Sequence, residues 1–492
     1  MSEHEGTTEE RLTAARQSKH ERVIAEGGYP HRFERTDLAA TLHDRYGDLE
    51  PGTQTDDRVT VAGRLMLHRS FGKLQFGTIQ DSSGSIQLFV DRGFSDAVAD
   101  EFGDYDLGDW VGATGLVMTT KKGELSVKVE ELTMLQKSLR PLPDKWHGLV
   151  DVEQRSRRRY LDLMVNPEAR HVALTRAKIV SELRRQFESR GFVEVETPVM
   201  LSQATGALAR PFLTHHNTLD LDLQLRIATE LYLKRLVVGG LERVFEVGRT
   251  FRNEGIDSTH NPEFTMLEAY QAFADYRDIM ELIEEVFIAV AEVATGTRKP
   301  TYQGRDLSFE PPFARVALAD LVSDFVGKPV SLDSDPSLLA SLLAERGGTE
   351  DSDADPGKLL FELYELAHRE VWDPTFVIDF PTVVSPLSRK REDDPRLTER
   401  FELVIAGSEY CNAFSELNDP ADQLARFEEQ AEARSAGDAE AHVIDYDYIE
   451  ALSYGLPPTG GLGIGVDRLV MLLTDQAHIR EVILFPTLRP ES

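Results

Sequence analysis

One cysteine and no long apolar run are the first features of this 492-residue sequence. Cys411 alone excludes disulfide bonds within the chain and any metal site built from several cysteines. Because no run of about 18 apolar residues occurs, we expect no membrane-spanning helix and no membrane partner. The first residues are polar and acidic, which predicts no secretory signal. These absences predict a cytoplasmic protein.

Basic residues are also scarce: 54 lysines and arginines stand against 85 aspartates and glutamates, and the net charge is −31. Taken alone, this charge argues against a nucleic-acid binder, because contacts to phosphate need local positive charge. Binding depends on the local field, however, and acidic residues gather in segments that we expect to be solvent-facing loops, such as 350–355. The basic segment 155–159 fits a solvated helix face as well as a nucleic-acid contact. The charge therefore leaves nucleic-acid binding open.

Length and pattern divide the chain into several parts. It is too long for one ordinary core, so two or three domains are expected. Residues 1–57 form an N-terminal extension with a charged amphipathic helix predicted over 8–26. Residues 58–140 carry short alternating runs separated by turn signals, which predicts a β-barrel of the size of a five-stranded OB fold. A linker that contains prolines follows over 141–150.

The largest part, residues 151–492, mixes helix and strand patterns. A helix that ends at Gly191 is predicted by apolar residues at helical spacing, namely Leu174, Ala177, Val180, Leu183 and Phe187. A strand closed by a proline is predicted over 192–198. Residues 277–375 are rich in helix patterns and acidic loops and hold no recognisable chemistry.

Two arginines stand in conspicuous surroundings. Arg252 lies in the run 249–255, predicted as a strand before a turn, and Arg468 opens a predicted helix behind the glycine-rich turn 461–465. Two guanidinium groups on separate rigid elements suit a substrate that carries phosphates, because arginine binds phosphate and carboxylate bidentately. The glycine run alone is a weak signal and is not a Rossmann fingerprint, since Asp467 and Arg468 stand where a further glycine is required.

Strand periodicity places unusual side chains together. One predicted strand carries Phe264, Met266, Glu268 and Tyr270 on one face, and a second, neighbouring strand carries Asn412, Phe414 and Glu416 on one face. A core face would not hold two unpaired glutamates, because a buried carboxylate without a partner is costly. The alternative is that both faces are reversed and the glutamates are solvated. Two carboxylates that converge in a dry pocket favour a cation, and a lysine ammonium fits with its three donors.

The arginine runs resemble motifs 2 and 3 of the class II aminoacyl-tRNA synthetases, and the helix with strand 192–198 is similar to motif 1. The segments 226–230, 260–264 and 412–419 resemble lysyl-tRNA synthetase in particular. The resemblance runs from about residue 10 to residue 490. It implies an α+β fold, with an OB-fold anticodon-binding domain followed by a catalytic domain built on an antiparallel sheet flanked by helices, a helical insertion over about 277–375, and a homodimer formed through motif 1.

The implied reaction joins L-lysine to ATP, releases pyrophosphate, and transfers lysine to the 3′ end of tRNA(Lys). The resemblance implies that Arg252 bridges the lysine carboxylate and the α-phosphate, and that Phe264 stacks on adenine. It further implies that ATP is bound by Arg252, Glu254, His260, Phe264, Glu402 and Arg468. Mg²⁺ is implied at Glu402 and Glu409, because magnesium combines one or two carboxylates with nucleotide phosphates. From the residues alone, Glu402 reads as a surface strand residue.

The same resemblance implies a set of residues that bind lysine and another that binds the anticodon. The lysine set is Gly206, Glu230, Arg252, Glu268, Tyr270, Asn412, Phe414 and Glu416, in which Glu268, Glu416 and Tyr270 surround the ε-ammonium and Glu230 receives the α-amino group. The anticodon set is Arg64, Phe76, Gln87 and Glu131, in which Phe76 stacks on a base. Taken alone, Phe76 reads as a core residue.

The sequence departs from the family pattern at a few positions. Thr229 stands where the family usually has proline, Thr205 with Gly206 stands where paired glycines are common, and Ser408 replaces a basic residue. Three alternatives remain open. The first is an aspartyl- or asparaginyl-tRNA synthetase of the same fold, the second a ligase that lysylates a translation factor, and the third a non-catalytic regulator that binds tRNA.

Overall fold

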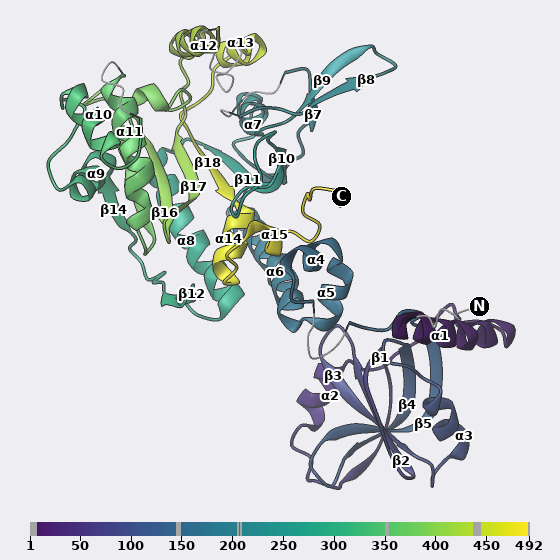
Figure 1. The fold of residues 1–492 in the computed structure, drawn as a ribbon. Coiled ribbons are helices and arrows are strands. Elements are labelled where there is room, and N and C mark those ends of the chain that lie inside the picture. The colour runs from purple at the N-terminus through teal and green to yellow at the C-terminus, as the bar shows by residue number, and fades with distance from the viewer. Residues whose placement is uncertain are drawn as a thin grey trace. The chain divides into compact units, whose positions relative to one another are not determined.

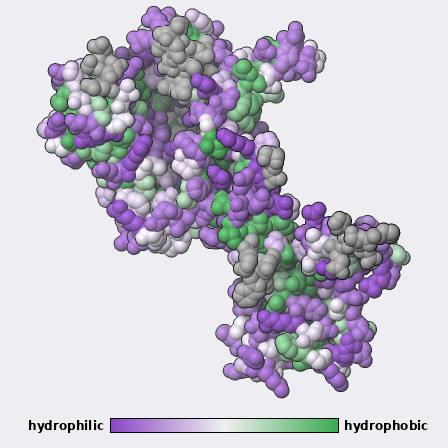
Figure 2. Space-filling view, viewed as in Figure 1, coloured by the Kyte–Doolittle hydropathy of each residue, from purple (hydrophilic) through white to green (hydrophobic). Residues whose placement is uncertain are grey.

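A computed structural model describes residues 7–143, 149–203, 206, 209–349, 354–435 and 444–490. The chain divides into two compact units, Met1–Val150 and Asp151–Ser492, which are coloured from purple to yellow in Figure 1. Hydrophilic residues cover most of the face shown in Figure 2, in keeping with the strongly acidic sequence. Within the described ranges, every helix is too short or too polar to cross a bilayer.

The first unit is a closed five-stranded barrel, as the sequence predicted. Its strands are β1 (Gln54–Phe71), β2 (Leu74–Gln80), β3 (Ser85–Asp91), β4 (Trp110–Thr119) and β5 (Leu125–Gln136), in the order β1-β2-β3-β5-β4. Alternate residues point inward, and the interior is closed by α2 (Ala39–Tyr46) and α3 (Asp96–Gly103), which bury Leu42 and Phe102. α1 (Thr8–Ala25) begins with a capping box between Thr7 and Glu10.

The second unit is built on an eight-stranded sheet of the order β14-β15-β16-β17-β18-β11-β10-β6. The strands are β6 (Val193–Glu194), β10 (Arg243–Phe251), β11 (Glu263–Ala272), β14 (Ala314–Ala317), β15 (Thr375–Ile378), β16 (Arg400–Ile405), β17 (Ser408–Ser415) and β18 (Thr459–Gly465). Only the two edge pairings, β14 with β15 and β6 with β10, are parallel. The predicted antiparallel sheet flanked by helices is therefore confirmed.

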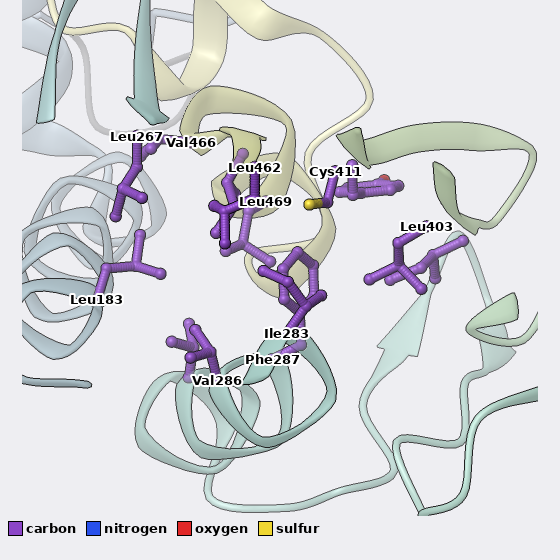
Figure 3. Packing of buried hydrophobic residues seen from close by; sticks show 14 of the residues in the cluster. Leu183, Leu267, Ile283, Val286, Phe287, Leu403, Cys411, Leu462, Val466 and Leu469 are labelled. Carbon is purple, nitrogen blue, oxygen red and sulfur yellow. The ribbon is translucent and has the colours of Figure 1, made fainter. Parts of the chain in front are cut away.

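Three helices cover one face of this sheet and form the main core. They are α6 (Pro167–Glu188), α8 (Tyr276–Thr295) and α14 (Val466–Leu473). Figure 3 shows Ile283, Val286 and Phe287 of α8 beneath Leu462 and Cys411 of the sheet. Because side chains alternate along a strand, the residues next to these core positions point to the opposite face.

The buried side of α6 differs from the predicted one. Val172, Ile179, Leu183 and Phe187 are buried, whereas Leu174 is 51% exposed. Several apolar side chains therefore lie outside the core of this unit. They are Leu174 and Ala177 on α6 and, on the edge strand β6, Val193, which is 52% exposed.

The remaining elements pack around this sheet. α7 (Glu230–Val238) lies on the opposite face, against β10 and β11. The other helices are α4 (Val152–Arg157), α5 (Arg159–Val165), α12 (Pro420–Ser435), α13 (Tyr446–Ser453), α15 (Ile479–Val482) and the 3-10 turns η1 (His368–Glu370) and η2 (Thr382–Val384). Short strands form two small sheets, β7 (Met200–Leu201), β8 (Leu213–His216) and β9 (Leu221–Leu225) in one, β12 (Thr301–Tyr302) and β13 (Arg305–Asp306) in the other.

Residues 277–375, expected as a helical insertion, do not form one separate helical part of the structure. α8 packs into the main core, and β14 and β15 belong to the large sheet. A separate apolar cluster is formed by α9 (Leu318–Val326), α10 (Pro336–Ala344) and α11 (Pro356–Ala367), which bury Val322, Leu339 and Leu363.

The basic segment 155–159 is used inside the second unit. Arg155 and Arg159 both bind the buried Asp162, at 2.9 and 2.5 Å, and Arg157 binds Glu153 at 2.6 Å. These three guanidinium groups therefore satisfy local carboxylates, which favours the structural interpretation of this segment.

Candidate active site

The floor of the site is strand β18, which lies between the two strands expected to be neighbours. The run 461–465 is part of this strand rather than a turn, so both expectations are corrected. Residue pairing joins Glu402, Asn412, Gly463 and Glu268 in one row across four strands, and Arg400, Phe414, Gly461 and Tyr270 in the next. The glycines at alternate positions remove side chains from the middle of each row, because these positions share one face.

Gly461 is required by close packing. A Cβ atom at this position would lie 2.0 Å from Glu416 Oε1 and 2.6 Å from the ring of Tyr270. The two side chains therefore approach each other over bare backbone. This contact places residues from the two predicted strand faces in one site, and the interpretation in which both faces are solvated is wrong.

Three glutamates and one lysine form a buried cluster above this floor. Glu230, Glu268 and Glu416 are at most 9% exposed, and the Lys234 side chain is fully buried. Lys234 Nζ donates to Glu230 Oε1 at 2.5 Å and is ion-paired with Glu416 Oε2. If all four groups are ionised, two negative charges remain. Burial raises the pKa of Glu416 well above its usual value, although the ammonium of Lys234 opposes this shift.

Aromatic rings surround the ammonium of Lys234. Its Nζ lies 5.4 Å from the ring centroid of Phe414, 5.9 Å from that of Tyr270 and 6.0 Å from that of Tyr448 on α13. Such rings attract a cation through their negative faces. Burial alone would lower the pKa of Lys234, but Glu230 and Glu416 raise it above its ordinary value, so the group stays charged.

Glu268 is held by the residue that departs from the family pattern. The backbone N–H of Thr229 donates to Glu268 Oε1 at 3.1 Å, a bond that proline cannot make because it has no N–H. Burial, reinforced by the charge of Glu230, raises the pKa of Glu268 to about 7. The Thr229 backbone and side-chain hydrogen bonds and the charge of Arg252 act in the opposite direction. Thr229 therefore supports the charged form of this carboxylate.

Gly206 and Arg226 shape the segment before α7. Gly206 adopts a φ of +96°, and a Cβ atom there would lie 3.4 Å from Glu230 Cβ, so the predicted neighbours are adjacent. Arg226 binds Glu246 on β10 at 2.5 Å and donates to the carbonyl of Arg249 at 2.8 Å, which fixes the start of α7 to the sheet. Thr205 lies outside the described residues.

Arg252 follows directly after β10. Its N–H donates to the carbonyl of Pro262 at 2.9 Å, and its guanidinium lies 5.2 Å from the ring centroid of Phe264. Burial lowers the pKa of Arg252, while the charges of Glu254, Glu409 and Glu268 raise it. The Nε atom has no hydrogen-bond partner among the described residues, although it is buried. A buried donor of this kind calls for an acceptor.

The outer end of the loop after β10 is exposed. Glu254 and His260 are both accessible, and His260 Nδ1 lies 2.8 Å from Asp257 Oδ2. Burial opposes ionisation of Asp257, but hydrogen bonds from Thr259 and His260 lower its pKa to about 2. The structure thus places these two predicted ATP residues at the rim of the site.

Glu402 is buried, so the interpretation as a surface strand residue is wrong. Its Oε2 accepts from the Tyr364 hydroxyl and its Oε1 from Arg400, both at 2.6 Å. Burial, with the neighbouring charge of Glu409, raises the pKa of Glu402 to about 7. A buried carboxylate whose pKa is raised by a neighbouring carboxylate suits a divalent cation, which would relieve the repulsion. Glu402 and Glu409 could hold a magnesium ion together with nucleotide phosphates, because magnesium is usually bound by one or two carboxylates and substrate phosphates.

Arg468 is oriented by its own motif. Its Nη1 donates to the carbonyl of Glu409 at 2.9 Å, and the Glu409 carboxylate lies 4.0 Å away. The preceding Asp467 accepts from Thr265 N at 2.6 Å and binds Arg176 of α6 at 2.5 Å. Asp467 therefore anchors the start of α14 between the sheet and α6, and this anchor directs Arg468 toward the Glu402–Glu409 pair.

The predicted anticodon residues lie on outward positions of the barrel. Phe76 points away from the core of the barrel, so its interpretation as a core residue is wrong. Its ring centroid lies 5.4 Å from that of Phe89 and 6.1 Å from that of Phe71. Gln87 lies on the adjacent strand and donates to Ser126 Oγ at 2.8 Å.

The other two members bind protein groups at the barrel surface. Arg64 donates to the carbonyl of Gly108 at 2.8 Å and stacks on Trp110, and Glu131 is ion-paired with Arg58 at 2.6 Å. Arg64, Phe76 and Gln87 thus come from the outward side of three consecutive strands.

Sequence reasoning missed three residues of the site. Lys234 carried a signal, because Glu230 and Lys234 are spaced i, i+4 on one helix. Arg400 alternates with Glu402 on β16 and joins it to Asn412, whose Oδ1 accepts from Arg400 at 3.1 Å. Tyr364 reaches Glu402 from α11, and no local pattern in the sequence points to this contact.

Comparisons with known proteins agree with this arrangement. Residues 151–489 match the family described as tRNA synthetases class II (D, K and N), and residues 59–135 match the OB-fold nucleic acid binding domain. The lysine–tRNA ligase of Thermosynechococcus vestitus is 51% identical over 99% of this chain and 98% of its own length. Those of Nostoc punctiforme and Prochlorococcus marinus are 50% and 51% identical over 98% and 95% of this chain, and 89% and 94% of their own lengths. The chain belongs to the class II lysyl-tRNA synthetases.

Proposed function

We propose that the buried carboxylate cluster binds the two ammonium groups of L-lysine, while Arg252 binds its carboxylate. The charge balance of the cluster carries this proposal: Glu230, Glu268 and Glu416 are met by one internal ammonium, so two negative charges remain when all four groups are ionised. A substrate with two ammonium groups matches this deficit, whereas aspartate would add a third charge of the wrong sign.

The residues divide between the two ends of lysine. Glu268, Glu416 and Tyr270 are assigned to the ε-ammonium, and Glu230 with the Gly206 backbone to the α-amino group. Asn412 and Phe414 line the floor between them. Glu416 Oε1, which is buried without a hydrogen-bond partner among the described residues, supports the assignment because it faces the bare backbone of Gly461.

Catalysis follows from positioning. The lysine carboxylate attacks the α-phosphorus of ATP in line, pyrophosphate leaves, and lysyl-adenylate forms. The 3′-terminal hydroxyl of tRNA then attacks the mixed anhydride and releases AMP. Arg252 draws the two reacting groups together, Arg468 binds phosphate, and Phe264 stacks on adenine, with Glu254 and His260 at the rim.

Magnesium would be held by Glu402 and Glu409 together with ATP phosphates. When bound there, it would neutralise charge on the pyrophosphate leaving group. Arg400 and Tyr364 hold the Glu402 carboxylate in place.

The experiment that tests the activity is amino-acid-dependent ATP–pyrophosphate exchange. We expect exchange with lysine and none above background with aspartate or asparagine. Exchange that depends on aspartate or asparagine would favour the related synthetases, and no exchange with any amino acid would favour the non-catalytic regulator. A translation-factor ligase would activate lysine yet fail to charge tRNA, so charging of tRNA(Lys) separates that alternative.

The OB barrel is proposed to bind the anticodon of tRNA(Lys). Phe76, with Phe71 and Phe89 beside it, offers stacking surface on the strands that such barrels use for single strands. Binding should weaken as salt rises, because phosphate contacts release counterions. We propose that this reaction takes place in the cytoplasm.

A homodimer through motif 1 is also proposed. Leu174 and Ala177 of α6 and Val193 of β6 are exposed apolar residues on the predicted motif 1 helix and strand. A second copy of the chain would cover them, and sedimentation of wild type against Leu174→Glu tests this: we expect a dimer to become a monomer.

A further inference from the structure

Lys234 connects two elements that meet at the amino-acid site. It stands one helical turn after Glu230 on α7, and its ammonium also reaches Glu416, which follows β17. One ammonium therefore holds a carboxylate of the helix and a carboxylate of the sheet at a fixed separation. Its side chain is fully buried, so solvent does not compete for these bonds.

We propose that Lys234 is a positioning residue that sets the distance between the two ends of the site and thereby selects the length of the diamino acid. The proposal rests on the proposed use of Glu230 at the α-amino end and Glu416 at the ε-ammonium end. Lys234 does not contact the reacting atoms; it acts through these two carboxylates.

The orientation of Glu416 gives the first argument. Lys234 takes Oε2, which leaves Oε1 directed at the backbone of Gly461 and without a hydrogen-bond partner among the described residues. A carboxylate can accept several hydrogen bonds, so one oxygen bound internally leaves the other for a ligand. Lys234 thus turns the free oxygen toward the floor of the site.

Energetics give the second argument. A buried ion pair contributes little net stability, because desolvation of the charges offsets their attraction. A fully buried ammonium among Phe414, Tyr270 and Tyr448 is therefore a poor device for stability alone. Removing it would leave two buried carboxylates without their counter-ion, and these are the groups proposed to bind substrate.

Length selection follows from the fixed separation. Ornithine is one methylene shorter than lysine, and two carboxylates held at one separation by Lys234 cannot fit both diamino acids equally well. In a rigid site, one methylene changes kcat/KM by roughly 10- to 200-fold. A site in which the carboxylates move independently loses part of this discrimination.

The test compares Lys234→Met with Lys137→Met in ATP–pyrophosphate exchange. Lys137 is an equally buried lysine, paired with Asp106 and Asp109 in the barrel unit, so its variant removes a buried ammonium that does not belong to the carboxylate cluster. For Lys234→Met we expect the lysine KM to rise about 100-fold, as truncation of a buried charge pair does, with the ATP KM within about threefold. The lysine-over-ornithine ratio of kcat/KM should fall about tenfold or more. Lys137→Met should change none of these three quantities.

Several results would overturn the proposal. They are an unchanged lysine KM, an equal rise in the KM of lysine and ATP, and a preserved lysine-over-ornithine ratio. If Lys234→Met does not fold, Lys234→Arg takes its place, since the longer planar group keeps the charge but displaces both carboxylates. A folded Lys234→Arg enzyme with normal lysine KM and normal discrimination would also overturn it. Wild-type exchange is measured in parallel. If the wild type shows no lysine-dependent exchange, the proposed function fails; if the wild type is active and the variants match it, only the proposed role of Lys234 fails.

Discussion

Two groups of carboxylates lie along the same sheet, and they differ in what neutralises them. Glu230 and Glu416 share the ammonium of Lys234, and Glu268 beside them accepts from the Thr229 N–H. Glu402 is instead held by Arg400 and Tyr364 and repels Glu409. The row Glu402, Asn412, Gly463, Glu268 connects the two groups across four strands. In the proposed function, the first group is the amine end of the site and the second is its phosphate end.

The difference lies in the shape of the partner cation rather than in charge alone. Aromatic rings surround the Lys234 ammonium of the first group, and such rings attract cations. The second faces Arg468, which favours phosphate together with a hard divalent cation. Burial raises the pKa of Glu268 and of Glu402 to about 7, so both ends gain from a cation that restores the charged form. Variants that affect one end and spare the other test this division.

Arg252 belongs to both ends, so its loss should have the largest effect. Arg252→Ala removes the guanidinium beside Phe264 that is proposed to bridge carboxylate and α-phosphate. We expect lysine-dependent exchange to fall by about a thousandfold or more, as for loss of an electrostatic group at the reacting centre. Arg305→Ala, whose arginine stacks on Trp372 outside the site, is the control and should keep normal exchange. Near-normal exchange by Arg252→Ala would remove Arg252 from the mechanism.

Glu268→Gln should affect the amine end alone. The amide keeps the shape of the side chain but loses its charge. We expect the lysine KM to rise about 30- to 100-fold, which is the effect of removing one member of a buried charge pair, and the ATP KM to change little. Glu182→Gln on α6 replaces another buried glutamate, one paired with Arg185 outside this site, and should leave both KM values unchanged. An equal rise in both KM values would mean that Glu268 is structural.

Glu402→Gln should affect the phosphate end alone. We expect the Mg²⁺ concentration for half-maximal exchange to rise about tenfold, because one of two carboxylate ligands loses its charge, while the lysine KM stays within about twofold. Titration of exchange with Mg²⁺ measures the first quantity. Glu370→Gln, at an exposed position in η1, is the control. A lysine KM that rises with the Mg²⁺ requirement would show that the two ends are not separable.

The faces of β11 and β17 could be predicted from the sequence because alternation is a local property of a strand. Glu268 with Tyr270, and Asn412 with Phe414, follow from a period of two residues. The position of β18 between these strands could not be predicted in the same way, because strand order depends on pairing between distant segments. The glycine run therefore read as a turn, although its alternate glycines were compatible with a strand face.

Contacts between distant elements explain the other differences. The buried stripe of α6 is shifted because α8 selects which side of the helix is covered, and Val172 and Ile179 meet it instead of Leu174. Glu402 is buried because α11, over 30 residues earlier, supplies Tyr364. The pairing of Lys234 with Glu230 could be predicted from their i, i+4 spacing. The pairing of Lys234 with Glu416 could not, because it depends on how distant segments fold together.

Thr229 offers the smallest and most selective change at the amine end. Thr229→Pro restores the usual family residue and removes both the N–H that donates to Glu268 and the hydroxyl. These groups stabilise the charged carboxylate, so their loss raises the pKa of Glu268 above its wild-type value of about 7. For the wild type, kcat/KM for lysine should fall as the pH drops below about 7, where Glu268 takes up a proton.

In Thr229→Pro, this acid limb should move to higher pH, and the lysine KM at neutral pH should rise about threefold, consistent with one net hydrogen bond of about 1 kcal/mol. Thr229→Ser keeps the N–H and a hydroxyl and should retain the wild-type profile. The pH dependence of kcat/KM for lysine measures both variants, with the ATP KM as the internal reference. An acid limb that stays in place in Thr229→Pro would show that this hydrogen bond does not set the charge of Glu268, and the amine end would then depend on Lys234 and Arg252 alone for its ionisation.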